Sequence, residues 1–208
     1  MSQNLIVSYL TLRKLIGILG ISLAGLTVAG GLLFGTGHIE GSISAYYLTN
    51  MRDLFVGVLA IAGAFLLTYT GYDRTDNIVT SIAGFSAIGV AIFPLEYVPP
   101  GSIFNIGYPA VMILHYISAA LFFGALAYMS YFQFTKSGST KTERKETRNL
   151  IYRICGHVMF WTLILIGAEA VLPFLDGGYW FILIVEIIIL IAFGVSWFVK
   201  GEAILADT

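Results

Sequence analysis

The stretch GSISAYYLTNMRDLFVG, residues 41–57, decides how the chain folds, because it is the most polar and aromatic connection between two long apolar segments. It runs directly into the second of these segments. The whole chain of 208 residues is 58% hydrophobic and only 11% charged, whereas soluble domains carry about 25% charged residues. A chain so poor in charge needs the bilayer as its solvent.

Six segments are long and apolar enough to cross a bilayer, which takes ~20 mostly apolar residues. Because a backbone inside lipid must satisfy its own hydrogen bonds, these segments are expected to be helices. We predict an all-α, polytopic membrane protein with a single domain, 1–208, in which six transmembrane helices form one bundle. The predicted spans are 11–34, 54–72, 77–97, 108–134, 150–174 and 179–199.

The basic residues orient this bundle. Ten of the eleven lysines and arginines fall on one side of the predicted spans, and Arg52 alone falls on the other. Since cytoplasmic loops carry the excess of basic residues, both termini are predicted to be cytoplasmic and residues 41–57 to face outward. We expect a bacterial inner membrane, with Tyr152 and Trp197 in the aromatic belt on the cytoplasmic side.

Small residues recur along the second and third spans at steps of three and four, which lets helix backbones approach closely in lipid. We therefore expect these two spans to lie in the interior of the bundle or to pack on each other. The sixth span is almost all Ile, Leu, Val and Phe around its circumference, so we expect much of it to face lipid. The two small-residue faces run through Asp53, Gly57, Ala60, Ala64, Thr68 and Gly71 and through Thr80, Gly84, Ala87, Ala91 and Pro94.

Ionisable groups inside a span are costly and mark candidate sites. Five such groups come from five different helices and fall within roughly 10–15 Å of the outer interface, at a rise of ~1.5 Å per residue. They are Asp53, Glu96, His115, Glu169 and Glu186. We predict an outward-facing polar pocket that is covered by residues 42–47 and formed by Asp53, His115, Glu169 and Glu186. The predicted ligand-binding residues are Ser42, Ser44, Tyr46, Tyr47, Arg52, Asp53, His115, Glu169 and Glu186.

Purely structural interpretations compete with this prediction. Asn50 followed three residues later by Asp53 has the form of a helix cap. Glu96 precedes Val-Pro-Pro-Gly and is typical of a turn at the membrane interface. A pair of His115 with Glu186 inside the bundle would satisfy both side chains without any ligand.

The predicted function is the binding of a lipid or small ligand in this pocket, and two alternatives stay open. A metal-dependent intramembrane hydrolase needs about three His or carboxylate ligands, which His115, Glu169 and Glu186 could supply to zinc. A small proton-coupled carrier would use the same buried carboxylates as a relay. Apart from that zinc, no cofactor is predicted, and whether the protein is an enzyme is left open. Membrane lipids are the expected partners, a homo-oligomer is compatible with the sequence, and the net charge of -1 argues against nucleic acid.

The outer stretch also carries a family resemblance. Ser42-Ile-Ser44-Ala-Tyr-Tyr before an acidic residue, together with six spans and cytoplasmic ends, resembles the DRAM-like six-span membrane proteins and their uncharacterised bacterial relatives. That resemblance implies an integral membrane protein, in some relatives tied to lipid handling. Met51-Arg52-Asp53 stands here where the family typically has Pro-Glu. A fainter similarity is to the alkaline ceramidase and adiponectin receptor hydrolases, which have seven spans and a three-histidine zinc site.

Overall fold

The computed structural model describes residues 8–35, 37–95, 106–136, 142–172 and 177–205, and within these ranges the chain is helical and contains no strand. This confirms the predicted all-α class. Five helices, all of the long ones except α2, are long and apolar enough to cross a membrane. The elements are α1 (Tyr9–Phe34), η1 (Ser44–Leu48), α2 (Arg52–Thr68), α3 (Arg74–Ile92), α4 (Ala110–Tyr128), η2 (Met129–Gln133), α5 (Glu143–Val171) and α6 (Phe181–Lys200).

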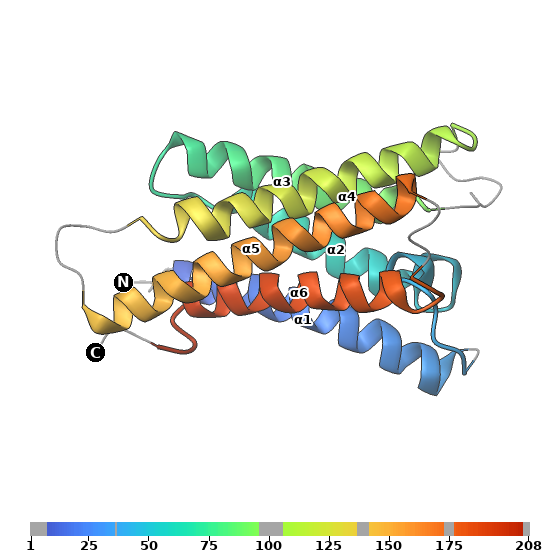
Figure 1. Cartoon of the computed structure of the whole chain (residues 1–208), viewed down its shortest axis with the longest axis horizontal. Coiled ribbons are helices and arrows are strands. Elements are labelled where there is room, and N and C mark those ends of the chain that lie inside the picture. The colour runs from blue at the N-terminus through green and yellow to red at the C-terminus, as the bar shows by residue number, and fades with distance from the viewer. Residues whose placement is uncertain (1–7, 36, 96–105, 137–141, 173–176, 206–208) are drawn as a thin grey trace, which may run out of the picture.

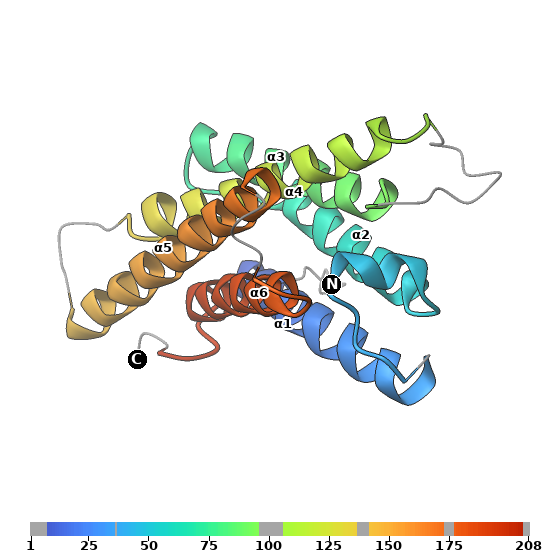
Figure 2. The same ribbon diagram turned by 45° about the vertical axis from the view of Figure 1, so that its right-hand side comes forward.

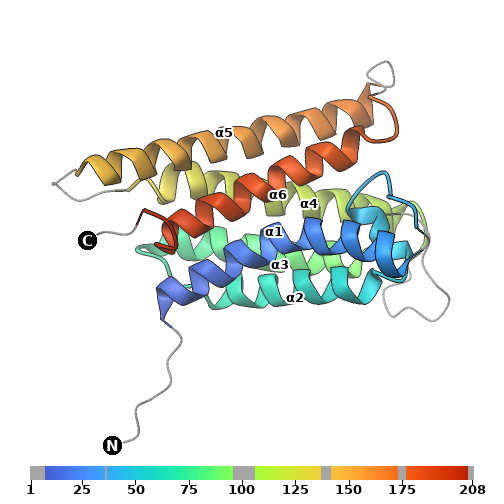
Figure 3. The same cartoon turned by 90° about the horizontal axis from the view of Figure 1, so that it is seen from below.

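The six long helices form a closed ring in chain order. Each packs against the helices before and after it, and α6 returns to pack against α1 (Figures 1, 2 and 3). The end of α6 lies beside the beginning of α1, where Gly201 touches the backbone and side chain of Lys14. We refer to this end of the bundle as the Lys200 end, and to the opposite end, which carries η1, as the η1 end.

Two pairs of glycines make especially close contacts between helix backbones. A Cβ added to Gly17 of α1 would lie 2.9 Å from the carbonyl oxygen of Gly194 in α6, and a Cβ on Gly194 would lie 2.9 Å from that of Gly17. Gly63 of α2 and Gly84 of α3 face each other in the same way, at 2.9 and 2.8 Å. Because a backbone carbonyl cannot turn aside, any side chain at these positions would push two helices apart.

The predicted packing of α2 on α3 is confirmed, but the face predicted for α2 is wrong. Ala60, Ala64 and Thr68 are exposed, whereas Gly63 is buried one position away. The face predicted for α3 is buried from Thr80 to Ala91. Lipid tails are as apolar as packed side chains, so alanine is tolerated on either face and its spacing alone does not select the buried one.

The expectation that much of α6 faces lipid is only partly right, because Ile184, Ile188 and Ile191 are exposed on one side while the other side is packed. More than half of the most apolar stretch of α6 is buried, the largest share among the five candidate spans. Ile189, Phe193 and Trp197 are almost completely enclosed, since α6 lies between α1 and α5 and faces the centre of the ring. A helix that is apolar all round carries no pattern that would distinguish lipid from a packed interior.

The Gly63 contact can be tested against a matched glycine of the same helix. We expect Gly63→Ala to destabilise the protein by about 1–3 kcal/mol, because the new methyl group meets the Gly84 carbonyl. A Cβ at Gly57 has nothing within 4 Å, so Gly57→Ala should be neutral or stabilise by up to ~1 kcal/mol through helix propensity. Unfolding of both variants in detergent measures the difference, and equal stability would contradict the close approach.

Candidate functional site

The segment around η1 folds back onto the bundle because two glycines of α1 make room for its side chains. A Cβ on Gly31 would lie 2.6 Å from the ring of Tyr46, and a Cβ on Gly30 would lie 2.4 Å from the sulfur of Met51. Tyr46 is fully buried as a result. We call residues 41–48, which lie over this end of the ring, the cap.

The predicted capping of α2 is wrong, and Asn50 serves another helix. The residue before α2 is Met51, which makes no side-chain capping hydrogen bond. The Asn50 amide instead donates to the carbonyl oxygen of Phe34, at the end of α1. The last carbonyls of a helix have no partner inside it, so Asn50 satisfies one of them. Asp53 is exposed in the first turn of α2.

Other predicted residues hold the cap together. The Ser42 hydroxyl accepts a hydrogen bond from the backbone N–H of Ala45 at 3.0 Å. The Arg52 guanidinium donates to the Tyr47 hydroxyl at 2.9 Å and lies over its ring, 4.6 Å from the centroid. These contacts give Ser42, Tyr47 and Arg52 a structural role at the η1 end.

Three side chains from distant parts of the chain meet beneath the cap, and we call them the Ser44 network. Ser44 Oγ lies 3.1 Å from Glu186 Oε1 of α6 and 3.2 Å from His115 Nε2 of α4. The other carboxylate oxygen of Glu186 accepts a hydrogen bond from the backbone N–H of Ile43. His115 Nδ1 lies 2.7 Å from the carbonyl oxygen of Phe93, just after α3. His115 is buried, and Ser44 and Glu186 are half-buried.

The geometry fixes one proton of the Ser44 network and allows two arrangements of the others. The Phe93 carbonyl can only accept, so Nδ1 of His115 must carry a proton. If Nε2 is unprotonated, Ser44 donates to it and a protonated Glu186 donates to Ser44. If Nε2 is protonated, the donor directions reverse and the network holds a carboxylate and an imidazolium. The two arrangements differ only by shifting protons along two hydrogen bonds through one hydroxyl.

Of the four residues predicted to form the pocket, the described hydrogen bonds join only His115 and Glu186. His115 and Glu186 come together through Ser44, but Asp53 is exposed and Glu169 is half-buried without a hydrogen bond or ion pair to any described residue. Glu96 lies outside the described residues. A groove lies elsewhere, on the outside of α3 and α4, and is lined by Arg74, Asn77, Ile78, Ser81, Ile82, Phe85, Ser86 and Leu121.

The residues proposed for zinc are likewise not gathered. Within the described ranges no three His, Cys, Asp or Glu side chains are placed to hold one metal ion. Two of the predicted ligands, His115 and Glu186, flank Ser44, while Glu169 stands apart near the end of α5. In that part of the chain the hydrolase alternative therefore has no ligand set.

A second polar region, at the Lys200 end, was not predicted. Arg13 of α1 donates to the Tyr69 hydroxyl at 3.0 Å, and its guanidinium carbon lies 5.5 Å from the centroid of that ring. The Lys200 ammonium lies 5.1 to 5.8 Å from the centroids of three rings and donates to the Phe134 carbonyl at 3.3 Å. We call Arg13, Lys200 and the rings of Tyr69, Tyr72, Phe134, Tyr152 and Trp197 the Lys200 cluster.

The Lys200 cluster corrects the prediction for two aromatic residues. Tyr152 is only 3% exposed and Trp197 is completely buried, so neither belongs to an aromatic belt at the membrane surface. Trp197 meets Tyr69 and Phe134 edge-on, at centroid distances of 5.4 and 5.1 Å. Their position close to helix ends suggested a belt, but the rings turn inward and pack around Arg13, which is buried, and Lys200, which is half-buried.

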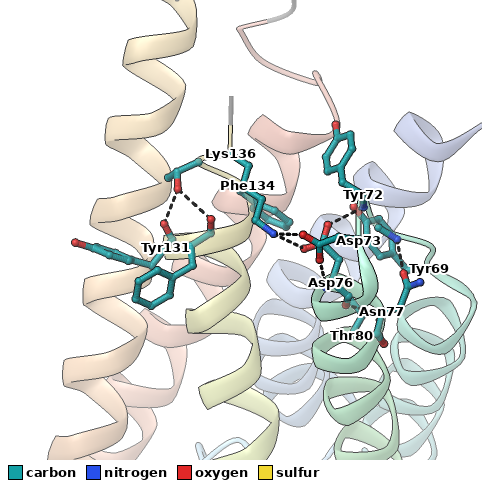
Figure 4. Close-up of polar contacts among 12 residues, drawn as sticks. Tyr69, Tyr72, Asp73, Asp76, Asn77, Thr80, Tyr131, Phe134 and Lys136 are labelled. Carbon is teal, nitrogen blue, oxygen red and sulfur yellow. Dashed lines mark hydrogen bonds and ion pairs between the residues drawn. The ribbon is translucent and has the colours of Figure 1, made fainter. Parts of the chain in front are cut away.

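Carboxylates of the turn between α2 and α3 complete this end of the bundle (Figure 4). Lys136 reaches Asp73 at 2.5 Å and Asp76 at 3.7 Å. Asp73 accepts from the backbone N–H of Asp76 and caps α3, while buried Asp76 accepts from the N–H of Tyr72. The hydrogen bond from Lys136 lowers the pKa of Asp73, and the same contact raises the pKa of Lys136.

Comparison of the chain with protein-family models, with curated proteins and with solved structures finds no match in any of the three. The function is therefore argued from the residues of this chain alone.

The proton arrangement of His115 is open to direct measurement. We expect its neutral form to carry the proton on Nδ1, because the partner of that nitrogen is a carbonyl oxygen. Nitrogen NMR of protein with ¹⁵N-labelled histidine distinguishes the two tautomers, and His115→Gln assigns the signal. Ser44→Ala should keep this tautomer and shift only the Nε2 signal. A neutral His115 protonated on Nε2 would contradict the geometry.

Proposed function

We propose that the chain is a six-span protein of a bacterial inner membrane, with both termini in the cytoplasm and the cap on the outer side. Five helices of membrane-crossing length and the closed ring support this proposal. α2 would be the sixth span: its 17 residues extend over about 26 Å, close to the ~30 Å hydrocarbon core of a bilayer. The gathering of ten basic residues on one side of the spans supports the orientation.

We further propose that the protein binds a small ligand, or a lipid headgroup, beneath the cap. The Ser44 network carries this proposal, because Glu186 and His115 are satisfied by groups that belong to the cap itself. Polar groups at membrane depth are costly without partners, so a lifted cap leaves them in need of new ones. A group with hydroxyl or amine donors would replace Ile43 N–H and the Ser44 hydroxyl at the carboxylate of Glu186.

The construction of the cap supports a moving part at this place. η1 has only five residues, and Gly31 and Gly30 of α1 receive the ring of Tyr46 and the thioether of Met51. A segment this short can move as one unit, at the cost of exposing Ile43, Tyr46 and Tyr47, which are buried beneath it. The resemblance to the DRAM-like proteins stays a prediction, and it is consistent with a lipid as the ligand.

A proton-coupled carrier is the second candidate, and one observation favours it. The Ser44 hydroxyl stands between an acid and a base, so a proton can pass from Glu186 to His115 along two hydrogen bonds. Chains of this kind, built from acidic residues and histidine within a membrane, are used as proton relays. In this candidate the cap controls access of protons from the outer side.

Glu186→Gln, with Glu169→Gln as its matched control, tests the ligand proposal. Mass spectrometry of the purified full chain should detect a co-purifying molecule with hydroxyl or amine groups. We expect its occupancy to fall roughly tenfold or more in Glu186→Gln, since a hydrogen bond to a charged group contributes about 1.5–3 kcal/mol. Glu169 is outside the network, so Glu169→Gln should retain the molecule. Equal occupancy in the two variants, or an empty wild-type protein, would contradict the proposal.

The same pair of variants decides between the two candidates. In proteoliposomes with a pH gradient, a carrier predicts proton flux that Glu186→Gln abolishes and Glu169→Gln leaves intact. A binding protein predicts no flux in either variant or in the wild type.

A further inference from the structure

We propose that the Lys200 cluster binds one phosphodiester group, the headgroup phosphate of an anionic lipid, between Arg13 and Lys200. This site is at the opposite end of the bundle from the Ser44 network and does not depend on the function proposed there. Enclosed cations that have no carboxylate beside them, together with buried donors that have no acceptor, point to an anion.

The two cations of the cluster, Arg13 and Lys200, have no carboxylate at ion-pair distance within the described ranges. Among the described residues, no carboxylate oxygen lies within 4.0 Å of Arg13 or Lys200; the ion pairs of this region involve Lys136 and Arg148 instead. Both cations lie against the ring of Tyr72, at 5.9 and 5.1 Å from its centroid. Like charges held near one ring at the edge of a low-dielectric interior repel each other, and an anion between them would reverse the sign of that interaction.

The charges at this end of the bundle are predominantly positive. The cations are Arg13, Lys14, Lys136, Arg148 and Lys200, and the carboxylates are Asp73, Asp76 and Glu202. Five positive and three negative groups leave an excess of positive charge. The phosphodiester of an anionic lipid carries one negative charge and reduces this excess.

Several buried polar atoms at this end of the bundle have no hydrogen-bond partner among the described residues. Nε of Arg13 and Nε1 of Trp197 are enclosed donors with no hydrogen-bond acceptor among the described residues. Trp197 meets Tyr69 and Phe134, the same rings that hold the two cations. Phosphate oxygens are suited to such donors. In the part of the chain that the structure describes, Oε1 of Gln133 is a buried acceptor without a hydrogen bond and is suited to a bridging water beside the phosphate, whereas Oδ1 of Asp76 has no hydrogen bond but pairs with Lys136 at 3.7 Å.

The cluster lies close to the surface at one end of the bundle. Arg13 lies in the second turn of α1 and Lys200 is the last residue of α6, so both cations are at the end of the bundle. Tyr72, whose ring lies near both of them, is 68% exposed, so this side of the cluster reaches the surface. Lipid headgroups are found at this depth, and basic pockets between helices bind anionic ones. The position therefore favours a lipid over a soluble phosphodiester as the source of the phosphate.

Lys200→Gln, compared with Arg153→Gln, tests the proposal on the full chain in detergent. Arg153 is an exposed basic residue of α5 outside the cluster, so its variant controls for general loss of charge. Phosphatidylglycerol should raise the unfolding temperature more than phosphatidylcholine with the same acyl chains. We expect Lys200→Gln to weaken the apparent affinity for phosphatidylglycerol about fivefold, the effect of one basic residue at a membrane surface, and Arg153→Gln to change it little.

Equal responses of the two variants, or equal effects of the two lipids, would overturn the site. If deacylated glycerophosphoglycerol alone matches phosphatidylglycerol, the phosphodiester site stands and its lipid source is overturned. Should Lys200→Gln fail to fold, Lys200→Arg keeps the charge: a retained preference for phosphatidylglycerol supports the site, and a lost preference contradicts it.

Discussion

The structure depends on one constraint: a carboxyl group placed within an apolar helix must find hydrogen-bond partners. Glu186 is surrounded along α6 by isoleucine, leucine and valine, and α6 itself offers it no donor. Its partners come from Ile43 and Ser44, about 140 residues earlier in the chain. The cap must therefore fold back over the ring of helices, and the glycines of α1 let it do so.

The packing of the ring also depends on contacts within the protein. Lipid supplies no hydrophobic drive for one helix to pack on another, so close backbone approach and internal hydrogen bonds hold the helices together. Gly17 with Gly194 closes α1 on α6, and Gly63 with Gly84 joins α2 to α3. The closure of α6 on α1 places Glu186 under the cap at one end and Lys200 beside Arg13 at the other. Both polar regions are consequences of one set of contacts.

Local features of this fold could be predicted from the sequence, and pairings could not. The length and apolarity of the segments predicted the helices. The cost of placing ionisable side chains in lipid identified His115 and Glu186 as candidates. The sequence placed Ser44 in the same predicted site, but it did not show that Ser44 would bridge them, because its partners lie 71 and 142 residues away. Asn50 was predicted to cap the helix that follows it, yet it serves α1. The Lys200 cluster was missed because aromatic residues near helix ends look alike whether they face headgroups or buried cations.

The coupling between Ser44 and Glu186 is the most direct test of this account. A double-mutant cycle with Ser44→Ala and Glu186→Gln, measured by unfolding in detergent, isolates their interaction from their separate effects. The account predicts a coupling of about 0.5–3 kcal/mol, while the control cycle of Ser44→Ala with Glu169→Gln should be additive within ~0.5 kcal/mol. A Ser44–Glu186 coupling no larger than that of the control would mean that the cap is not held by the carboxylate.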